Sequence, residues 1–580
     1  MNRYSILLLL AIAVGLTGCE DLLEPVNENR RGLEDIYENP MRAEGLLMNA
    51  YTRLPTNSYS FNDVATDDAV TNNKQNSFLQ MATGQWSAMF NPMDQWNNSY
   101  TAILYLNKFL QSVDSVEWSY TSDEANRLFA IRHTGEAYGL RALFMLNLLR
   151  SHGGYSSGNI LLGVPIIVEP LDNNAEAFAK PRNTFEECMQ QIYSDLAKAI
   201  EILPLEYANA RNAGAIPPHL RGFSLETYNR VMGEFNRQRL SGAAAMAIRA
   251  QAALLAASPA FSSGTTTTWE DAANHAASLL NLIEGVSGLD NVGHLFYTPA
   301  GVTRFTGDRQ TEMAWRGSRI DQSLDREREN FPPSLFGNGR VNPTRNLVDA
   351  FPMANGYPID HANSGYDPSN PYNNRDPRLR HYIVVNGDTL AGQAVYTAMG
   401  SGNDAVDFLP TSTRTGYYMR KLLREDVNVN PANQVPQRQI VPHIRYTEIF
   451  LAYAEAANEA WGPDGSGVHG YSARDVIQAI RERAGIEQPD TYLASITTTE
   501  GMRMLIRNER RLELCFEGFR FWDLRRWKES ITTPAMGVRI ENSTYQVTVV
   551  ENRLYESFML FPPVPYSEVL KFGFEQNNGW

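Results

Sequence analysis

The sequence predicts a mostly α-helical protein built from pairs of packed helices, with long irregular insertions and small β elements. Three observations support this fold class. Apolar residues recur at helical spacing in several segments, such as Glu136–Arg150. These segments occur in pairs along the chain. Between the pairs lie long polar stretches, 56–98 and 286–442, that are rich in Asn, Gly, Pro, Asp and Tyr.

Each expected pair joins two amphipathic or apolar segments. The pairs are Glu136–Arg150 with Thr184–Leu203, Leu240–Ala257 with Trp269–Ile283, and Ile444–Trp461 with Ser472–Gly485. Thr184 and Glu187 have the spacing of a capping box, and Pro204 stops that helix. Small residues such as Ala243, Ala247 and Ala454 recur on the first helix of a pair, which lets two helix backbones approach closely.

The three pairs resemble tetratricopeptide hairpins, which stack into an α-α superhelix, although their separation is not a fixed ~34 residues. A helical core without repeat logic is the alternative. The two insertions are much longer than the ~15 residues of an ordinary loop, and such segments tend to be functional. A rigid helical stack whose insertions shape a surface suits a binding protein.

The N-terminus reads as a targeting segment. Residues 1–18 form a signal peptide whose apolar run, Ile6–Leu16, has 11 residues and is too short to cross a membrane. The sequence Leu16-Thr17-Gly18-Cys19 matches a bacterial lipobox, so we expect Cys19 to be lipidated and 19–38 to form a tether. An ordinary signal peptide with an incidental Cys is the alternative.

Composition narrows the function classes. The chain has 580 residues, 43% of them hydrophobic, and a net charge of −14, which argues against nucleic acid as a ligand. No metal-binding, phosphate-binding or nucleophile motif is present, so we expect no metal, no cofactor and no catalysis. Cys188 and Cys515 lie in apolar helical patterns, which favours buried free thiols over a disulfide.

One segment matches a known family closely. Arg507–Lys528 (RNERRLELCFEGFRFWDLRRWK) resembles the signature of the SusD/RagB family of Bacteroidetes nutrient-binding outer-membrane lipoproteins. The matching positions are Glu509, Arg510, Glu513, Leu514, Glu517, Gly518, Arg520, Asp523, Leu524, Arg525, Arg526 and Trp527. Further family blocks are Trp96–Asn107, Asn373–Ile383, Arg445–Asn458 and Pro562–Gln576. The resemblance therefore covers essentially the whole chain.

The signature also has a physical interpretation. Glu509, Glu513 and Glu517 are spaced to share one helix face, and the arginines of the same segment compensate their charge. We expect a structural salt-bridge lattice, with Gly518 at a helix C-cap. A paired-carboxylate hydrolase site is the alternative, but a general acid needs a raised pKa, and arginines hold carboxylates ionised.

The resemblance implies a function. It implies a single SusD-like domain, 19–580, that is lipid-anchored in the outer membrane and exposed at the cell surface. It implies that this domain captures an oligo- or polysaccharide, delivers it to a SusC-like TonB-dependent transporter and closes over that barrel as a hinged lid. The acidic residues Glu20, Asp21 and Glu24 resemble a surface-export signal. The rivals are peptide capture, a glycoside hydrolase and a purely structural lipoprotein.

Sugar binding needs exposed aromatic planes beside polar groups that bind hydroxyls. Trp86, in a Gly-Gln-Trp-Ser turn, is the first choice as stacking platform. The candidate ligand-binding residues from the insertions are Trp86, Asp67, Asp68, Tyr297, Trp315, Arg316 and Tyr396, with Tyr417 and Tyr418 further along. Asp67 and Trp86 fall in a region that fructan-binding family members seem to use, which favours a fructan. Starch, hemicellulose and host glycans stay open.

Overall fold

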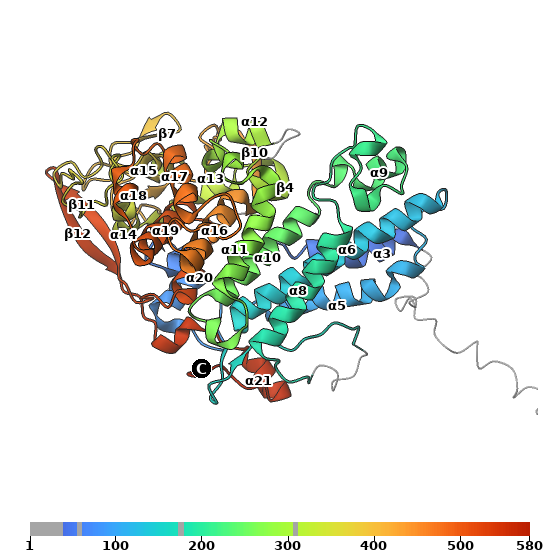
Figure 1. Cartoon of the computed structure of the whole chain (residues 1–580). Coiled ribbons are helices and arrows are strands. Elements are labelled where there is room, and N and C mark those ends of the chain that lie inside the picture. Colours follow the sequence, from blue (N-terminus) through green and yellow to red (C-terminus); the bar gives the residue numbers. More distant parts are fainter. Residues whose placement is uncertain (1–38, 55–60, 172–178, 306–310) are drawn as a thin grey trace, which may run out of the picture.

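The structure, a computed structural model, describes residues 39–54, 61–171, 179–305 and 311–580. The expected signal peptide 1–18, the lipidation site Cys19 and the tether 19–38 lie outside the described residues. Figure 1 shows two parts: a stack of long helices, and a mixed region of short helices, strands and loops at one end of that stack.

Long helices form the first part. They are α3 (Pro40–Tyr51), α5 (Trp96–Ser112), α6 (Asp123–His152), α8 (Phe185–Ile202), α10 (Gly242–Ala257), α11 (Trp269–Leu280), α16 (Tyr446–Trp461), α17 (Ala473–Ala484) and α19 (Thr499–Glu513). Contacts join α3 to α5, α5 to α6, α6 to α8, α8 to α10, α10 to α11, and α11 to α16. Helix α16 in turn contacts α17 and α19. The prediction of stacked helix pairs is therefore confirmed.

The helix ends follow local chemistry. The Thr184 side chain accepts a hydrogen bond from the Glu187 amide at 3.2 Å, and the Glu187 carboxylate accepts one from the Thr184 amide at 2.7 Å, so the predicted capping box begins α8. Ser472 caps the start of α17, and Gly485 ends it in the left-handed conformation. Helix α6 begins at Asp123, well before the expected start at Glu136.

Small side chains bring the stack together. In α10 every Ala is buried, and α16 buries Ala452, Ala454, Ala456 and Ala457. All residues of α10 except Arg249 and Gln251 are buried. This helix lies between α8, α11 and α16, which explains why its hydrophobic residues lack a single preferred face.

The second insertion, 286–442, contains short helices and strands between its loops and has its own hydrophobic core. Leu347, Phe351, Tyr382 and Tyr417 lie in this core and are buried. Its helices are α12 (Pro299–Phe305), α13 (Asp325–Asn330), α14 (Arg345–Ala350) and α15 (Arg378–Tyr382). Burial of these apolar side chains stabilises the segment as a packed body.

The strands are few and paired in twos, as the expectation of small β elements requires. The described residues contain six two-stranded sheets. The strands are β1 (Ala69–Thr71), β2 (Gly154–Tyr155), β3 (Leu161–Leu162), β4 (Met313–Ser323), β5 (Val341–Pro343), β6 (Ile383–Val384), β7 (Thr389–Leu390), β8 (Gln393–Ala394), β9 (Tyr418–Met419), β10 (Gln437–Arg445), β11 (Ala535–Glu541) and β12 (Thr544–Glu551). Strand β10 pairs antiparallel with β4, and it runs directly into α16.

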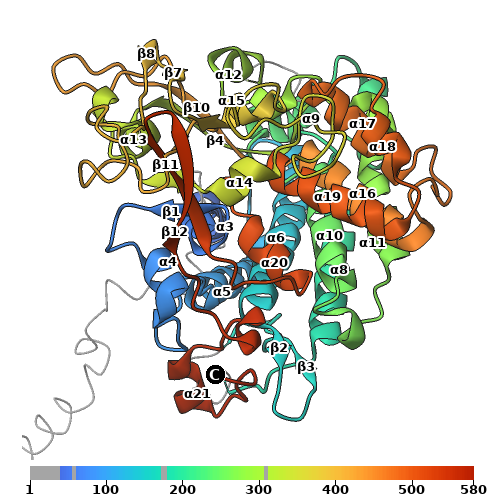
Figure 2. The ribbon, with the colours of Figure 1, turned by 90° about the vertical axis from the view of Figure 1, so that its left-hand side faces the viewer.

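The C-terminal region closes one end of the stack. The short helices α4 (Ser77–Gln80), α9 (Leu225–Met232), α18 (Thr491–Ser495), α20 (Arg520–Arg526) and α21 (Tyr566–Phe572) complete the fold. Figure 2 shows the β11–β12 hairpin extending along the side of the molecule, with the C-terminus beside α21. None of the described helices is long and apolar enough to cross a membrane.

The signature carboxylates form the predicted salt-bridge lattice, but with unexpected partners. Glu509 contacts Arg378 and Arg481, each at 2.8 Å, and Glu513 contacts Arg378 at 2.9 Å and Arg483 at 2.7 Å. Glu517 contacts Lys421 and Arg445, each at 2.7 Å. These cations come from other segments of the chain, whereas the arginines of the signature that form ion pairs do so with other carboxylates.

The structure contradicts two of the expectations for the signature segment. Helix α19 ends at Glu513 with Leu514 as its C-cap, so Glu517 does not share the helix face of the other two carboxylates. Gly518 is therefore not a C-cap. It has a positive φ of 85° in the turn between α19 and α20, where a residue with a Cβ would be strained.

The two cysteines behave as predicted. Cys188 and Cys515 are free and buried. Burial raises the pKa of each thiol to about 12, so both stay protonated at neutral pH.

Candidate functional site

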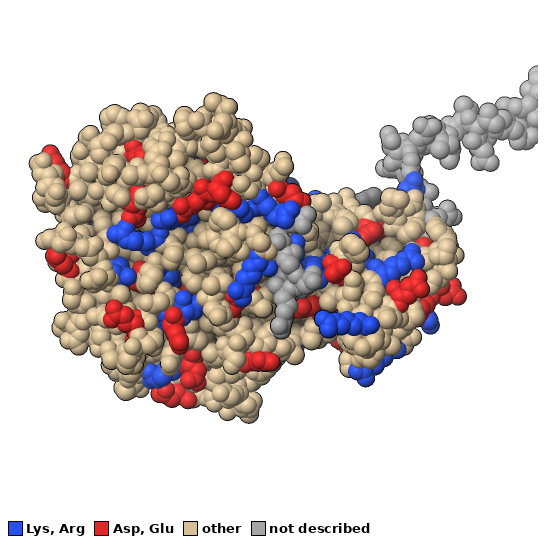
Figure 3. All heavy atoms as spheres, turned by 90° about the horizontal axis from the view of Figure 1, so that it is seen from above, with Lys and Arg blue, Asp and Glu red and all other residues tan. Residues whose placement is uncertain are grey.

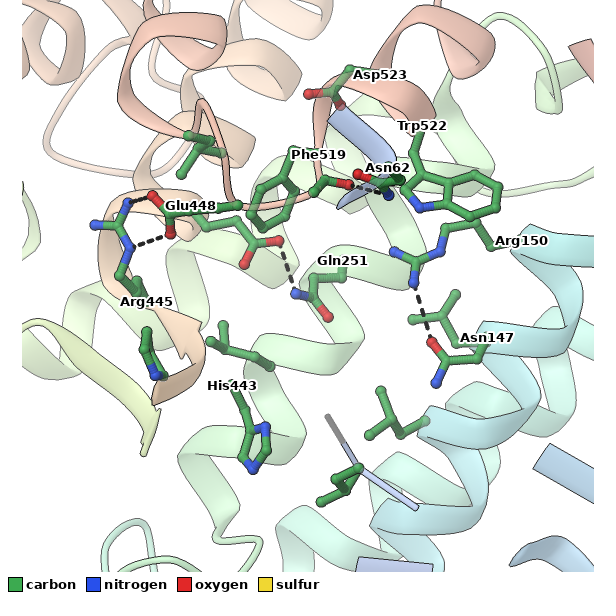
Figure 4. A pocket seen from close by; sticks show the side chains of 18 of the residues that line it. Asn62, Asn147, Arg150, Gln251, His443, Arg445, Glu448, Phe519, Trp522 and Asp523 are labelled. Carbon is green, nitrogen blue, oxygen red and sulfur yellow. Dashed lines mark hydrogen bonds and ion pairs between the residues drawn. The ribbon is translucent and has the colours of Figure 1, made fainter. Parts of the chain in front are cut away.

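A cavity of about 720 Å³ lies between the helix stack and the two insertions. Its walls come from α6 and α10, from β10 and the start of α16, and from the turn leading into α20. The first insertion adds Asn62 and Gln95, and the second adds Phe296. The insertions thus shape a hollow together with the rigid helices, as the sequence suggested, and Figure 4 shows its lining.

Aromatic side chains form one wall. Phe519 and Trp522 come from the start of α20 and are half-buried, so part of each ring faces the cavity. The guanidinium of Arg150, near the end of α6, lies over the Trp522 ring at 4.9 Å from its centroid. In Figure 4 Arg150 lies between the Trp522 indole and Asn147. This wall offers apolar ring surface beside a cation.

Amide side chains provide hydrogen-bonding groups. Asn147 accepts a hydrogen bond from Arg150 at 3.3 Å. Gln251, from α10, donates to Glu448 at 2.8 Å, and Asn62 donates to the Gly518 carbonyl at 3.2 Å. An amide has two donors and one acceptor oxygen, so each of these groups keeps further capacity for a ligand.

The carboxylates of the lining are already engaged. Glu517 binds Arg445 and Lys421. Asp523 binds Arg510 at 2.8 Å and Arg526 at 2.7 Å, and these cations hold its pKa below the usual range although burial opposes them. Glu448 is buried, and burial raises its pKa despite Arg510 and the hydrogen bond from Gln251. This arrangement holds charge in place and leaves no free carboxylate pair for acid–base chemistry.

His443 lies on β10 at the edge of the cavity. Its ring centroid is 4.6 Å from that of Trp315. Burial lowers the pKa of His443 to about 4, so the imidazole is neutral at physiological pH. It offers the site a neutral hydrogen-bonding group.

The structure buries Trp86, so its expected role as an exposed stacking platform is wrong. Only 4% of the side chain is exposed. Its ring packs against Phe521, Tyr555 and Trp580, with centroids 5.0–5.9 Å away, and its indole N–H donates to Asn91 at 3.0 Å. Trp86 anchors the first insertion to the C-terminal region.

Asp67 and Asp68 are also buried and cannot act as exposed acceptors for sugar hydroxyls. Asp67 accepts hydrogen bonds from Arg520 at 2.9 Å and from Arg511 at 3.0 Å, and Asp68 accepts one from Arg511 at 2.7 Å. Burial opposes ionisation of Asp67, but the two arginines hold its pKa well below the usual range. This pair ties the first insertion to the signature segment.

The remaining candidates are mostly buried too. Tyr297 donates its hydroxyl to the His381 carbonyl at 3.0 Å, and Trp315 donates its indole N–H to the Gln238 carbonyl at 3.1 Å. Trp315 borders the cavity, but its ring is buried, as is the side chain of Arg316. The expectation of exposed aromatic planes is wrong for both rings.

Tyr396 differs from the other candidate aromatic residues because 52% of its surface is exposed. It does not line the cavity, so its role in binding stays a prediction. Tyr417 and Tyr418 are fully buried.

Sequence reasoning missed the residues that the cavity brings together: Asn62, Asn147, Arg150, Gln251, Phe519 and Trp522. Phe519 and Trp522 stand in the aromatic-rich signature, a context that favours burial. Arg150 and Asn147 stand in the apolar end of α6, where a charged residue amid apolar ones was the available signal. Within the described residues no group of three His, Cys, Asp or Glu is arranged to hold a metal ion.

Two family models match this chain. The SusD family model matches residues 304–580, and a model described as starch-binding associating with outer membrane matches 29–213. A SusD-like protein of Formosa agariphila is 34% identical over 110 residues, and the match spans 19% of each chain, about a fifth of that relative's length.

Solved structures share the fold. A SusD-like protein of Bacteroides fragilis matches with a TM-score of 0.72 and 23% identity over 95% of this chain and 100% of that one. A SusD-like carbohydrate binding protein, also of Bacteroides fragilis, matches with a TM-score of 0.69 and 21% identity over 92% of this chain and 99% of that one. A surface glycan-binding protein of Bacteroides fluxus matches with a TM-score of 0.59 and 18% identity over 94% of this chain and 100% of that one.

The two family matches lie on either side of the segment that carries α10 and α11, and the shared fold spans nearly the whole chain. Proteins of this family bind their ligands without catalysing a reaction. The chain belongs to the SusD/RagB family, whose SusD-like members are glycan-binding proteins associated with the outer membrane.

Proposed function

We propose that this protein captures an oligo- or polysaccharide in the cavity at the cell surface and delivers it to a SusC-like TonB-dependent transporter, over which it acts as a lid. In this proposal residues 1–18 are removed, Cys19 carries the lipid, and 19–580 form a single SusD-like domain on a tether. A tethered protein meets its partner at high effective concentration, so a modest glycan affinity suffices.

The lining of the cavity is the observation that carries this proposal. Sugar rings present C–H faces and hydroxyl edges. The half-buried rings of Phe519 and Trp522 offer apolar surface for those faces, and Gln251, Asn147 and Asn62 offer amide groups for the hydroxyls. A cavity of about 720 Å³ falls within the usual 300–1,000 Å³ of small-ligand sites, and it has room for a short oligosaccharide.

Charge pairing supports binding over hydrolysis. Both Glu517 and Asp523 are held by two cations, and Glu448 is bonded to Gln251. Two similar structures are of a carbohydrate binding protein and a laminarin binding protein, which agrees with a glycan ligand here.

The expectation of a fructan is not retained. It relied on Asp67 and Trp86, and both side chains are buried in contacts within the protein. The identity of the glycan must follow from the cavity instead.

The experiment is a glycan array probed with the full-length protein in detergent, followed by calorimetric titration of the best glycan. Trp522→Ala should weaken binding about tenfold or more, because the loss of an aromatic platform costs at least about 1.4 kcal/mol. Tyr120→Ala removes a ring that is 66% exposed and outside the cavity, and should leave affinity unchanged.

Three results would contradict the proposal. They are no glycan bound on the array, equal affinity of Trp522→Ala and wild type, and tighter binding of a peptide library than of any glycan. Chromatography of the incubated glycan should show no cleavage products. Co-purification of a TonB-dependent barrel with the protein from its native membranes tests the partner.

A further inference from the structure

The charges around the cavity differ from those of the protein as a whole. The net charge of the chain is −14, yet the lining contains six arginines and three acidic residues. The arginines are Arg53, Arg150, Arg326, Arg445, Arg510 and Arg526. Figure 3 shows one outer face of the molecule, where basic and acidic side chains lie in mixed groups among uncharged residues. The cavity is therefore a local concentration of positive charge.

Three of these six arginines are paired with carboxylates, but Arg150 is not. Arg445 binds Glu312 and Glu517, Arg510 binds Asp523, and Arg526 binds Glu455 and Asp523. Arg150 forms no ion pair with a carboxylate of the described residues. Its hydrogen bond goes to the neutral amide of Asn147, and its buried Nε has no hydrogen-bond partner.

Arg150 is half-buried, and even partial burial of a guanidinium without a counter-charge is costly, because it removes water that would otherwise solvate the charge. Burial indeed lowers the pKa of Arg150, although the more distant carboxylates of Glu448 and Asp523 oppose this effect. The Trp522 ring below and Asn147 beside it hold the guanidinium in one orientation. Its remaining N–H groups are preorganised for an anion, which guanidinium binds with paired hydrogen bonds.

The carboxylates of Glu517 and Asp523 in the lining are each paired with two cations, so they add little net negative charge that would repel an anion. Glu448 is buried with a raised pKa and is bonded to Gln251. Arg53 also borders the cavity, and its hydrogen bonds go to the neutral amides of Asn49 and Asn98. A second cation without an ion pair among the described residues thus lines the same hollow.

We propose that the cavity selects an anionic saccharide, whose carboxylate or sulfate group binds the guanidinium of Arg150 while its ring lies against the aromatic wall. This inference rests on the proposed glycan-binding function and adds a charge requirement to it. Arg150 is then the residue that distinguishes an acidic sugar from a neutral one of the same shape.

The test uses the full-length protein in detergent, at constant ionic strength, with wild type, Arg150→Gln and Arg150→Lys. Calorimetric titration compares tetragalacturonate with its neutral methyl ester, which keeps the backbone and removes the charge. We expect the wild type to bind the acid at least about tenfold more tightly than the ester, and Arg150→Gln to remove that preference. Arg150→Lys keeps the charge without the paired geometry and should retain part of the preference.

Small anions provide a second measurement that does not depend on the glycosidic linkage of the saccharide. Glucuronate or sulfate, compared with glucose and chloride, should raise the thermal midpoint of the wild type and not that of Arg150→Gln. The anion that raises the thermal midpoint more indicates whether the charged group of the natural saccharide is a carboxylate or a sulfate. Arg328→Met, which removes an exposed arginine that is not part of the lining, is the control and should respond as the wild type does.

The outcomes separate this inference from the proposed function. If the ester binds wild type as tightly as the acid, or if neither anion raises the wild-type midpoint, the inference is wrong. It is also wrong if Arg150→Gln responds to anions as the wild type does. Neutral glycans bound equally by both proteins would leave the glycan function intact. An acidic peptide, tetraglutamate, bound more tightly than tetragalacturonate would contradict the choice of a saccharide.

Discussion

Arg378 holds the centre of the buried charge lattice, and its replacement tests whether the lattice is structural. Its side chain is 0% exposed. It contacts Asp376 at 2.6 Å, Glu509 at 2.8 Å and Glu513 at 2.9 Å, and so joins α15 to α19. In Arg378→Met an apolar side chain takes the place of the aliphatic part of the arginine, and the guanidinium is lost. Three buried carboxylates then lose the cation that they share.

We expect this substitution to reduce the free energy of unfolding by about 3–5 kcal/mol at pH 7, because it leaves buried charge uncompensated. Glu509 keeps Arg481 and Glu513 keeps Arg483, which limits the loss to this range. The same substitution at the exposed Arg328, which pairs with Asp325, should cost no more than about 1 kcal/mol.

The loss of unfolding free energy in Arg378→Met should also depend on pH. Burial alone would raise the pKa of Glu513, but Arg483 and Arg378 hold it well below its usual range. Its stabilising contribution is therefore present above the unfolded pKa of about 4.3 and is lost as the pH falls below it. Without Arg378 the native pKa of Glu513 rises, so the folded variant binds protons more readily. The difference in stability between wild type and variant should narrow as the pH falls from 7 to about 4.

Urea unfolding followed by circular dichroism at pH 7 and at about pH 4 measures both effects. A loss at Arg378 no larger than that at Arg328 would refute the structural role of the lattice. A loss that grows on acidification would refute the electrostatic explanation.

Two further predictions concern buried titratable groups. Asp63 is buried, both its carboxyl oxygens lack a hydrogen-bond partner among the described residues, and burial together with Asp68 raises its pKa to about 8. In the unfolded chain the Asp63 carboxyl ionises near pH 4, so its destabilising effect on the folded state grows as the pH rises from about 4 to 8. Asp63→Asn should therefore stabilise the protein by roughly 1–3 kcal/mol at pH 7 and by less at pH 5. Urea midpoints at the two pH values check this, and an unchanged midpoint at pH 7 would be evidence against it. Cys188 and Cys515, with pKa values raised to about 12 by burial, should resist iodoacetamide at pH 8 until urea is added, as mass spectrometry of the peptides can show. Rapid labelling of either thiol in the native protein would contradict its burial.

The helix stack could be predicted from sequence because its signals are local. The start of α8 follows from Thr184 and Glu187, and the end of α17 from Gly485, each within a few residues of the element. The apolar face of α8 recurs every three or four residues, so its burial could also be predicted.

The core of the second insertion could not be predicted in the same way, because its contacts are distant in sequence. Strand β4 pairs with β10 across more than a hundred residues, and neither strand predicts its partner. The polar composition of 286–442 described the surface of this body and concealed a core that includes Leu347 and Tyr382.

The candidate site failed for a related reason. Trp86 stands in a polar turn that favours exposure, but Phe521, Tyr555 and Trp580, which lie far along the chain, bury it. Trp522 stands in an aromatic-rich segment that favours burial, yet its ring is partly open to the cavity. Composition predicted the kind of side chain a sugar needs, while tertiary packing decided which rings remain available.

A crystal structure of the full-length protein with its best-binding oligosaccharide tests the central claim most directly. We predict that one sugar ring lies in the cavity, against Trp522 and within hydrogen-bonding distance of Gln251 or Asn147. Sugar density confined to the outer surface, for example around the exposed Tyr396, with an empty cavity, would contradict this account.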